Sequence, residues 1–222
     1  MAEQAAKQPA WKDYARYCSL REQGLRKQAF ASLDFFIEKA SQWDFTSQKA
    51  FVLWLCGKMD TVEDADYGPF PAPLRSKLFV PFFRDWLRRE PENDEVYALR
   101  ARYLREPWFY QRAVELNPQN QRARHALAVA CIDGIWHATH HLPHYFIGDE
   151  RDVKSIADEA HDHISHVEQS DRQRLLQQRL AQEEALLDDW IAFKQESGED
   201  FDAWCRSMGR QYSWIKAYYY ER

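Results

Sequence analysis

Apolar residues recur at three- and four-residue steps along much of the chain, which is the spacing of one face of an α-helix. Residues 24–43 carry one such stripe, and residues 152–167 carry a longer one that keeps a single face for about four turns. The first stripe consists of Ala29, Leu33, Phe36, Ile37 and Ala40, and the second of Val153, Ile156, Ala157, Ala160, Ile164 and Val167. We therefore expect amphipathic helices in both segments.

Polar residues and prolines between the stripes predict where helices begin. Asp149 precedes the second stripe at a plausible N-cap position, and a long helix is expected from about Arg172 to Lys194. Pro81 is expected either to kink one helix or to start a second, whereas Pro107 suits a first helical position. The aromatic tail, residues 201–222, is expected to dock on the body of the protein.

Composition supports the same class of fold. Glycine and β-branched residues are scarce, whereas Ala, Leu, Gln, Glu, Arg and Lys, which favour helices, are abundant. The sequence therefore predicts an all-α fold, with residues 1–222 forming a single compact domain of stacked helical hairpins.

An internal repeat sharpens this expectation. Setting "WLRREPENDEVYALRA" (86–101) above "AVELNPQNQRARHALA" (113–128) aligns Pro91 with Pro118 and Asn93 with Asn120, at an offset of 27 residues. In each copy a helix is expected to end at the residue before the proline, because that residue is pushed out of the α region, and a short polar turn then leads into the next helix.

The repeat resembles a tetratricopeptide repeat (TPR). In "YQRAVELNPQN", Tyr110, Ala113 and Pro118 fall at the aromatic, small and proline positions of the TPR motif, and Gly24 and Ala29 have the spacing of its glycine and alanine. The resemblance implies an irregular TPR-like stack over about 15–142, followed by a C-terminal helical portion over about 149–222. Stacks of this kind expose an extended surface that binds other proteins.

Charge is distributed unevenly over the chain. The net charge is −5, but residues 149–202 hold 16 Asp and Glu against 6 Lys and Arg, a local balance of −10. This asymmetry predicts a protein partner with a basic surface and does not favour nucleic acid. The expected contact residues are acids of this segment and exposed aromatics that precede it, namely Asp158, Glu159, Asp162, Glu184 and Asp188, and Trp108, Tyr110 and Tyr145.

All eight histidines lie between His125 and His166, which raises the alternative of a metal site. If a helix runs from about Asn120 to His141, one face carries the small-residue stripe Ala123, Ala126, Leu127, Ala130 and Gly134. The next positions on that face are His137 and His141, and such an i, i+4 pair can present two imidazoles to zinc. His163 on the following helix could complete a site for zinc or another transition metal, in a metal-binding protein or metal-dependent hydrolase. Alternatively the histidines are structural, with Glu159–His163 and Asp162–His166 as ordinary surface pairs.

Other catalytic patterns are missing from the sequence. It contains no glycine-rich phosphate loop, no G-x-S-x-G and no H-E-x-x-H, so we expect a protein that is not an enzyme and has no cofactor. The predicted function is a non-catalytic protein–protein interaction module, and in a sharper form a bacterial immunity protein that binds and neutralises a toxin domain.

The cellular location is predicted from cysteines and apolar runs. The four cysteines are widely spaced, no secretory signal is visible, and no apolar run reaches the roughly 20 residues of a membrane helix. We therefore expect a cytoplasmic protein without membrane contact.

Overall fold

A computed structural model describes residues 1–60, 70–168, 171–196 and 198–214. Every secondary-structure element in these ranges is a helix, which confirms the all-α prediction. Among the described helices, none is both long and apolar enough to cross a lipid bilayer. The chain divides into two compact units, Met1–Leu116 and Asn117–Arg222, and the division falls inside the segment predicted to hold TPR-like helices.

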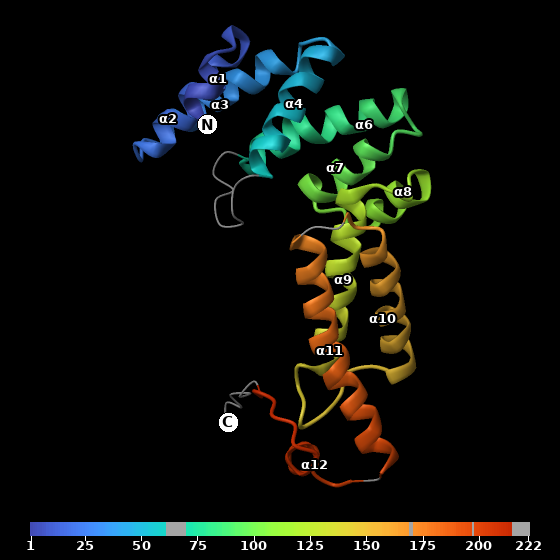
Figure 1. The fold of residues 1–222 in the computed structure, drawn as a ribbon. Helices are drawn as coiled ribbons and strands as arrows, with labels where there is room; N and C mark the ends of the chain where they lie inside the picture. The colour runs from blue at the N-terminus through green and yellow to red at the C-terminus, as the bar shows by residue number, and fades with distance from the viewer. Residues whose placement is uncertain (61–69, 169–170, 197, 215–222) are drawn as a thin grey trace. The chain divides into compact units, whose positions relative to one another are not determined.

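Unit 1, Met1–Leu116, is built from short helices that pack as neighbours in the sequence, such as α2 with α3 and α7 with α8 (Figure 1). Its α-helices are α1 (Ala2–Ala6), α2 (Lys12–Glu22), α3 (Arg26–Ala40), α4 (Phe45–Met59), α5 (Ala72–Leu74), α6 (Val80–Arg89), α7 (Asp94–Leu104) and α8 (Trp108–Leu116). A 3₁₀ turn (Pro9–Trp11) precedes α2, and a π-helical stretch (Arg75–Phe79) precedes α6. Pro81 lies in the first turn of α6, but Phe79 and Val80 before it have helical backbone angles, so the chain stays helical from the π-helical stretch into α6 and Pro81 does not start a separate helix.

Aromatic side chains fill the core of unit 1. Tyr14, Phe36 and Phe51 come from α2, α3 and α4, and their ring centroids lie 4.8–5.4 Å apart. Trp86 is completely buried, and its ring lies parallel to that of Phe83. Large rings therefore supply much of the apolar contact that holds these short helices together.

Unit 2, Asn117–Arg222, contains three long helices that lie side by side (Figure 1). They are α9 (Gln121–Thr139), α10 (Glu150–Ser165) and α11 (Asp171–Gln195), and the short α12 (Phe201–Ser207) follows. The predicted N-cap is confirmed, since the Asp149 carboxylate accepts a hydrogen bond from the Arg151 backbone N–H at 2.7 Å. The predicted long helix is confirmed as α11.

Small and aliphatic residues form the core between α9, α10 and α11, in contrast to unit 1. The buried residues include most of the predicted α10 stripe: Val153, Ala157, Ala160, Ile164 and Val167. Beyond them, Trp190, Phe193 and Phe201 form a separate aromatic cluster where α12 meets α11. The expected docking of the tail is confirmed for residues 201–214, and 215–222 lie outside the described residues.

The aligned repeat segments have matching helix boundaries. Asn93 and Asn120 both cap helices, accepting hydrogen bonds from the backbone N–H of Glu95 and Ala123. The preceding helices end at Arg89 and Leu116, before Pro91 and Pro118. Both helices end one residue earlier than predicted, the helix–turn–helix order is confirmed, and the TPR resemblance stays a prediction.

Candidate functional site

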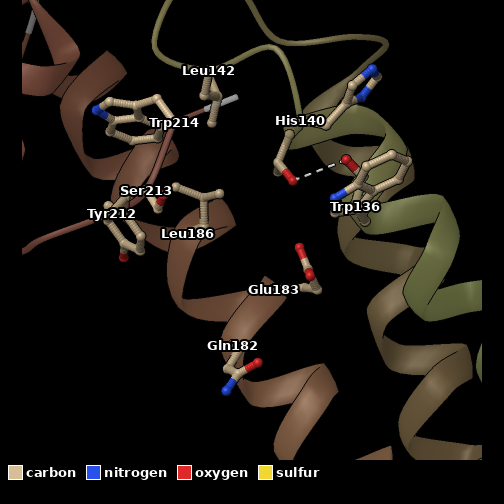
Figure 2. A pocket seen from close by; sticks show the side chains of 10 residues that line it. Trp136, His140, Leu142, Gln182, Glu183, Leu186, Tyr212, Ser213 and Trp214 are labelled. Atoms are coloured by element: carbon tan, nitrogen blue, oxygen red, sulfur yellow. Dashed lines mark hydrogen bonds between the residues drawn. The ribbon is translucent and has the colours of Figure 1, made fainter. Parts of the chain in front are cut away.

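A cavity of about 230 Å³ opens in unit 2 beside α11 (Figure 2). Three segments build it: the end of α9, the middle of α11, and the chain that follows α12. Its lining residues are Trp136, Thr139, His140, Leu142, Gln182, Glu183, Leu186, Tyr212, Ser213 and Trp214. We refer to this cavity as the Glu183 pocket.

Helical spacing explains why these side chains meet. Trp136, Thr139 and His140 recur at i, i+3 and i+4 near the end of α9, and Gln182, Glu183 and Leu186 occupy adjoining positions on α11. Each group therefore projects toward the same side of its helix. Figure 2 shows the Glu183 carboxylate pointing into the space that Trp136 and Leu186 border.

Carboxylates hold the segment after α12 in place. The Tyr212 hydroxyl donates to Asp189 Oδ2 at 2.6 Å, and Arg210 Nε lies 3.4 Å from the same oxygen. The Trp214 indole N–H donates to Asp202 Oδ1 at 2.6 Å. The polar ends of both aromatic residues are thus engaged outside the cavity, which fixes their rings as part of its wall.

The Glu183 carboxylate differs from these because no described residue hydrogen-bonds it. Burial raises the pKa of Glu183, and nearby Asp133 adds to this effect, while Arg179 opposes it. Arg179 forms an ion pair with another residue, since its Nη2 donates to Asp133 Oδ1 at 2.9 Å. Glu183 therefore presents two acceptor oxygens to the pocket with no hydrogen bond from a described residue, although the Arg179 charge lies near enough to lower its pKa.

A row of aromatic rings in contact, in which the His140–His141 pair is tilted and the pairs on either side are stacked, leads from the pocket along the protein surface. His140 lies 4.7 Å from Trp136 and 4.0 Å from His141, measured between ring centroids, and His141 lies 4.6 Å from Tyr145. The His140 Nδ1–H donates to the His137 carbonyl at 2.7 Å. Burial and the two neighbouring imidazoles lower the pKa of His141, which favours neutral, stacked rings.

The predicted metal ligands are not gathered into one site. His137 is exposed and His141 half-buried in this row of rings, whereas His163 is buried elsewhere in unit 2. Within the described ranges, no three His, Cys, Asp or Glu side chains form a group that could hold a metal ion. The face chosen from the sequence also differs from the buried one, because α9 buries Ala128, Ile132 and Ile135, while Ala130 is exposed.

His163 instead binds Arg124. Arg124 Nη1 donates to His163 Nδ1 at 2.9 Å and to Asp162 Oδ2 at 2.7 Å, and its Nε donates to the Pro118 carbonyl at 2.8 Å. Because a guanidinium can only donate, His163 Nδ1 accepts and the ring proton is on Nε2. The expected Glu159–His163 surface pair is therefore wrong, since His163 is a buried, neutral partner of Arg124 that joins α10 to α9.

The predicted partner-binding residues divide into available and engaged groups. Trp108 and Tyr145 are exposed, at 64% and 46%, while Tyr110 is half-buried. Asp158 and Glu159 are exposed and make no hydrogen bond or ion pair with a described residue. The other three acids are engaged: Asp162 with Arg124, Glu184 with His161 at 2.8 Å, and Asp188 with Lys154 at 3.3 Å.

Comparisons with known proteins add no family or relative: no protein-family model matches the sequence, and no curated protein or solved structure matches it. We therefore infer function from the residues of unit 2. Of these, the sequence pattern missed Glu183, Tyr212 and Trp214, which only the folding of α12 against α11 brings to one cavity.

Proposed function

We propose that this protein is a non-catalytic binding module, a TPR-like helical scaffold of the cytoplasm that holds a protein partner with a basic surface through unit 2. The observation that carries the proposal is the Glu183 pocket, an aromatic-walled cavity whose one carboxylate has no bonding partner among the described residues. An unpaired, half-buried carboxylate is costly for folding, so its presence favours a role in binding.

The surroundings of the pocket support the same partner. The α11 residues of the pocket belong to segment 149–202, which has a charge balance of −10, and the exposed acids Asp158 and Glu159 lie on neighbouring α10. The negative electrostatic potential of these acids speeds association with a basic surface and disfavours acidic partners. Exposed rings such as Trp136 and Tyr145 supply the large apolar contacts typical of binding surfaces.

A sharper form of the proposal is a bacterial immunity protein that neutralises a toxin domain. It is supported by the acidic, helical surface and by the missing catalytic motifs, since occluding a toxin requires tight contact rather than chemistry. If a captured partner arrests growth when expressed alone, co-expression of this chain should restore growth.

Capture from a native lysate tests the general proposal. We expect the full chain to retain a basic protein in stoichiometric amount, with cross-links on α10, α11 and the pocket rim, and with retention weakened by salt. The double substitution Asp158→Asn and Glu159→Gln should reduce capture, whereas Glu22→Gln with Glu38→Gln, two exposed acids of unit 1, should not. Cross-links confined to unit 1, or no stoichiometric partner, would contradict the proposal.

A further inference from the structure

The chemistry of the Glu183 pocket restricts what can occupy it. Its charged acceptor is a carboxylate, so an anion would be repelled, and an apolar group would bury that carboxylate without a partner. A metal ion would need further ligands, and the described residues supply no group of three. A cation that carries its own hydrogen-bond donors satisfies the Glu183 oxygens directly.

The size of the cavity indicates a single side chain. Pockets for drug-sized ligands measure about 300–1,000 Å³, and this one measures about 230 Å³. A cofactor or a folded peptide segment is therefore too large, whereas the end of one long basic side chain is not. The pocket is also open to the surface, because Trp136 and Gln182 on its border are exposed.

Aromatic walls favour a flat cation over a compact one. Trp136, Tyr212 and Trp214 present rings to the cavity, and the polar ends of Tyr212 and Trp214 are held by Asp189 and Asp202. Guanidinium stacks on aromatic faces and offers a planar fork of N–H donors that matches a carboxylate, whereas ammonium is a more strongly hydrated point charge.

We propose that the Glu183 pocket binds one arginine side chain of a basic polypeptide, with the guanidinium bonded to the Glu183 carboxylate between aromatic rings. This inference rests on the proposed function, because it identifies which group of the partner unit 2 recognises. The raised pKa of Glu183 agrees with it, since burial disfavours the charged carboxylate and a bound cation would offset that effect.

The test uses the full chain and three short peptides, acetyl-Gly-Arg-Gly-amide and its lysine and citrulline counterparts. Citrulline keeps the planar shape of arginine but is neutral. Binding is followed by NMR through the indole N–H signals of Trp136 and Trp214, which are assigned by Trp136→Phe and Trp214→Phe. We expect saturable shifts with the arginine peptide, and binding weaker by roughly tenfold or more with citrulline.

Matched variants separate the pocket from the general acidic field. Glu183→Gln should weaken arginine binding by roughly tenfold or more, whereas Glu199→Gln, an exposed acid of the same segment with the same change of charge, should leave it within about twofold. Equal binding of citrulline or lysine, equal loss in both variants, or no indole shift with arginine would overturn the inference. The citrulline comparison needs no variant, so it remains decisive if Glu183→Gln perturbs folding.

This experiment can fail while the proposed function stands. Capture of a basic partner on unit 2 together with no arginine-dependent shift would reject only the arginine site. Arginine-dependent shifts together with cross-links confined to unit 1 would reject the proposed function and keep the site.

Discussion

Each unit places a glutamate near a tryptophan, and the two carboxylates have opposite surroundings. In unit 1, Glu90 accepts hydrogen bonds from Lys49 Nζ at 3.0 Å, Trp86 Nε1 at 2.9 Å and Asn93 Nδ2 at 2.6 Å. In unit 2, no described residue hydrogen-bonds Glu183, although Trp136 lines the same cavity. Donors around Glu90 lower its pKa to about 2, whereas burial raises that of Glu183.

The contrast separates a carboxylate that connects helices from one that no described residue hydrogen-bonds. The bonds of Glu90 join α4, α6 and the turn before α7, so its charge helps hold three helices together. Glu183 joins nothing in the described chain, and its charge opposes folding because it loses water without gaining a donor. A bound cation with N–H donors would give Glu183 the kind of partner that Glu90 already has.

The largest expected effect comes from breaking the Glu90 network. Glu90→Ala leaves the buried Trp86 indole N–H and the Lys49 ammonium without their acceptor, and we expect it to lower the free energy of unfolding by about 1–2 kcal/mol. This figure is at the low end for charged hydrogen bonds, because the Glu90 side chain is 35% exposed and water can replace part of the contact. Urea unfolding followed by circular dichroism measures the change.

Glu92→Ala is the matched control for this prediction. Glu92 lies two residues further on, is exposed and has no ion pair or hydrogen bond with a described residue, so its loss should change stability by less than about 0.5 kcal/mol. Equal effects of the two substitutions would show that the Glu90 bonds do not hold unit 1 together.

A second prediction concerns acid, which should weaken the two units in different pH ranges. Burial and Arg124 lower the pKa of His163 below 6.5, so the unfolded chain binds a proton before the folded chain does. Unit 2 should therefore lose stability as the pH falls below about 6.5. In unit 1, the ionised Glu90 carboxylate should contribute fully to the free energy of unfolding above about pH 4.5. This contribution should be lost as the pH falls toward 2, because the Glu90 pKa is lowered from 4.5 to about 2.

Amide hydrogen exchange with mass spectrometry can follow each unit separately between pH 7 and pH 5, after correction for the intrinsic effect of pH. We expect protection to fall in α9 and α10 while the centre of unit 1 is unchanged. The groups facing His163 are Arg124, Asp162, Glu159 and His166. In His163→Gln the pH dependence of α9 and α10 should diminish, and if it persists at full size another group is responsible.

Sequence patterns sufficed for the helices but not for the pocket. The apolar stripe over 152–167 predicts α10, and Asp149, Asn93 and Asn120 mark helix starts, because both features are local in sequence. By contrast, Glu183 is one of 16 acids between residues 149 and 202, and Glu184 beside it has the same charge. Only tertiary packing gives Glu184 a partner in His161 and leaves Glu183 facing a cavity.

The histidines show how a correct spacing can support a wrong inference. His137 lies in the last turn of α9 and His141 in the turn directly after it, close to the predicted end of the helix. The sequence pattern of small residues nevertheless selected the wrong buried face, since Ile132 and Ile135 pack into the core instead. Small residues tolerate both core and surface, so a stripe of alanines fixes the face of a helix poorly.

A third prediction sharpens the comparison at Glu183 itself. Glu183→Gln removes a desolvated charge and keeps the shape of the side chain, so we expect unit 2 to become more stable by about 0.5 kcal/mol. Glu184→Gln, which weakens the contact with His161, should lower stability by less than about 0.5 kcal/mol. Urea unfolding measures both changes in the free energy of unfolding. An increase for Glu183→Gln with a decrease for Glu184→Gln would support the view that only Glu184 has a stabilising partner, and a clear decrease for Glu183→Gln would contradict it.

The smallest expected effect concerns what keeps Glu183 free of a partner. Arg179 lies four residues before Glu183 on α11 but donates to Asp133 of α9 at 2.9 Å. In Asp133→Asn this ion pair is lost, and Arg179 can then approach Glu183, a pair worth about 0.2–0.5 kcal/mol on a helix. Binding of the arginine peptide should therefore weaken about twofold, as measured by the indole N–H shifts.

A double-variant cycle isolates this competition. Arg179→Met alone should strengthen arginine binding slightly, because it removes a positive charge near the pocket. If Arg179 is the competitor, Asp133→Asn should have no further weakening effect in the Arg179→Met background. The same twofold loss in both backgrounds would mean that Asp133 contributes its own negative charge to cation binding, and that the Asp133–Arg179 pair does not protect Glu183.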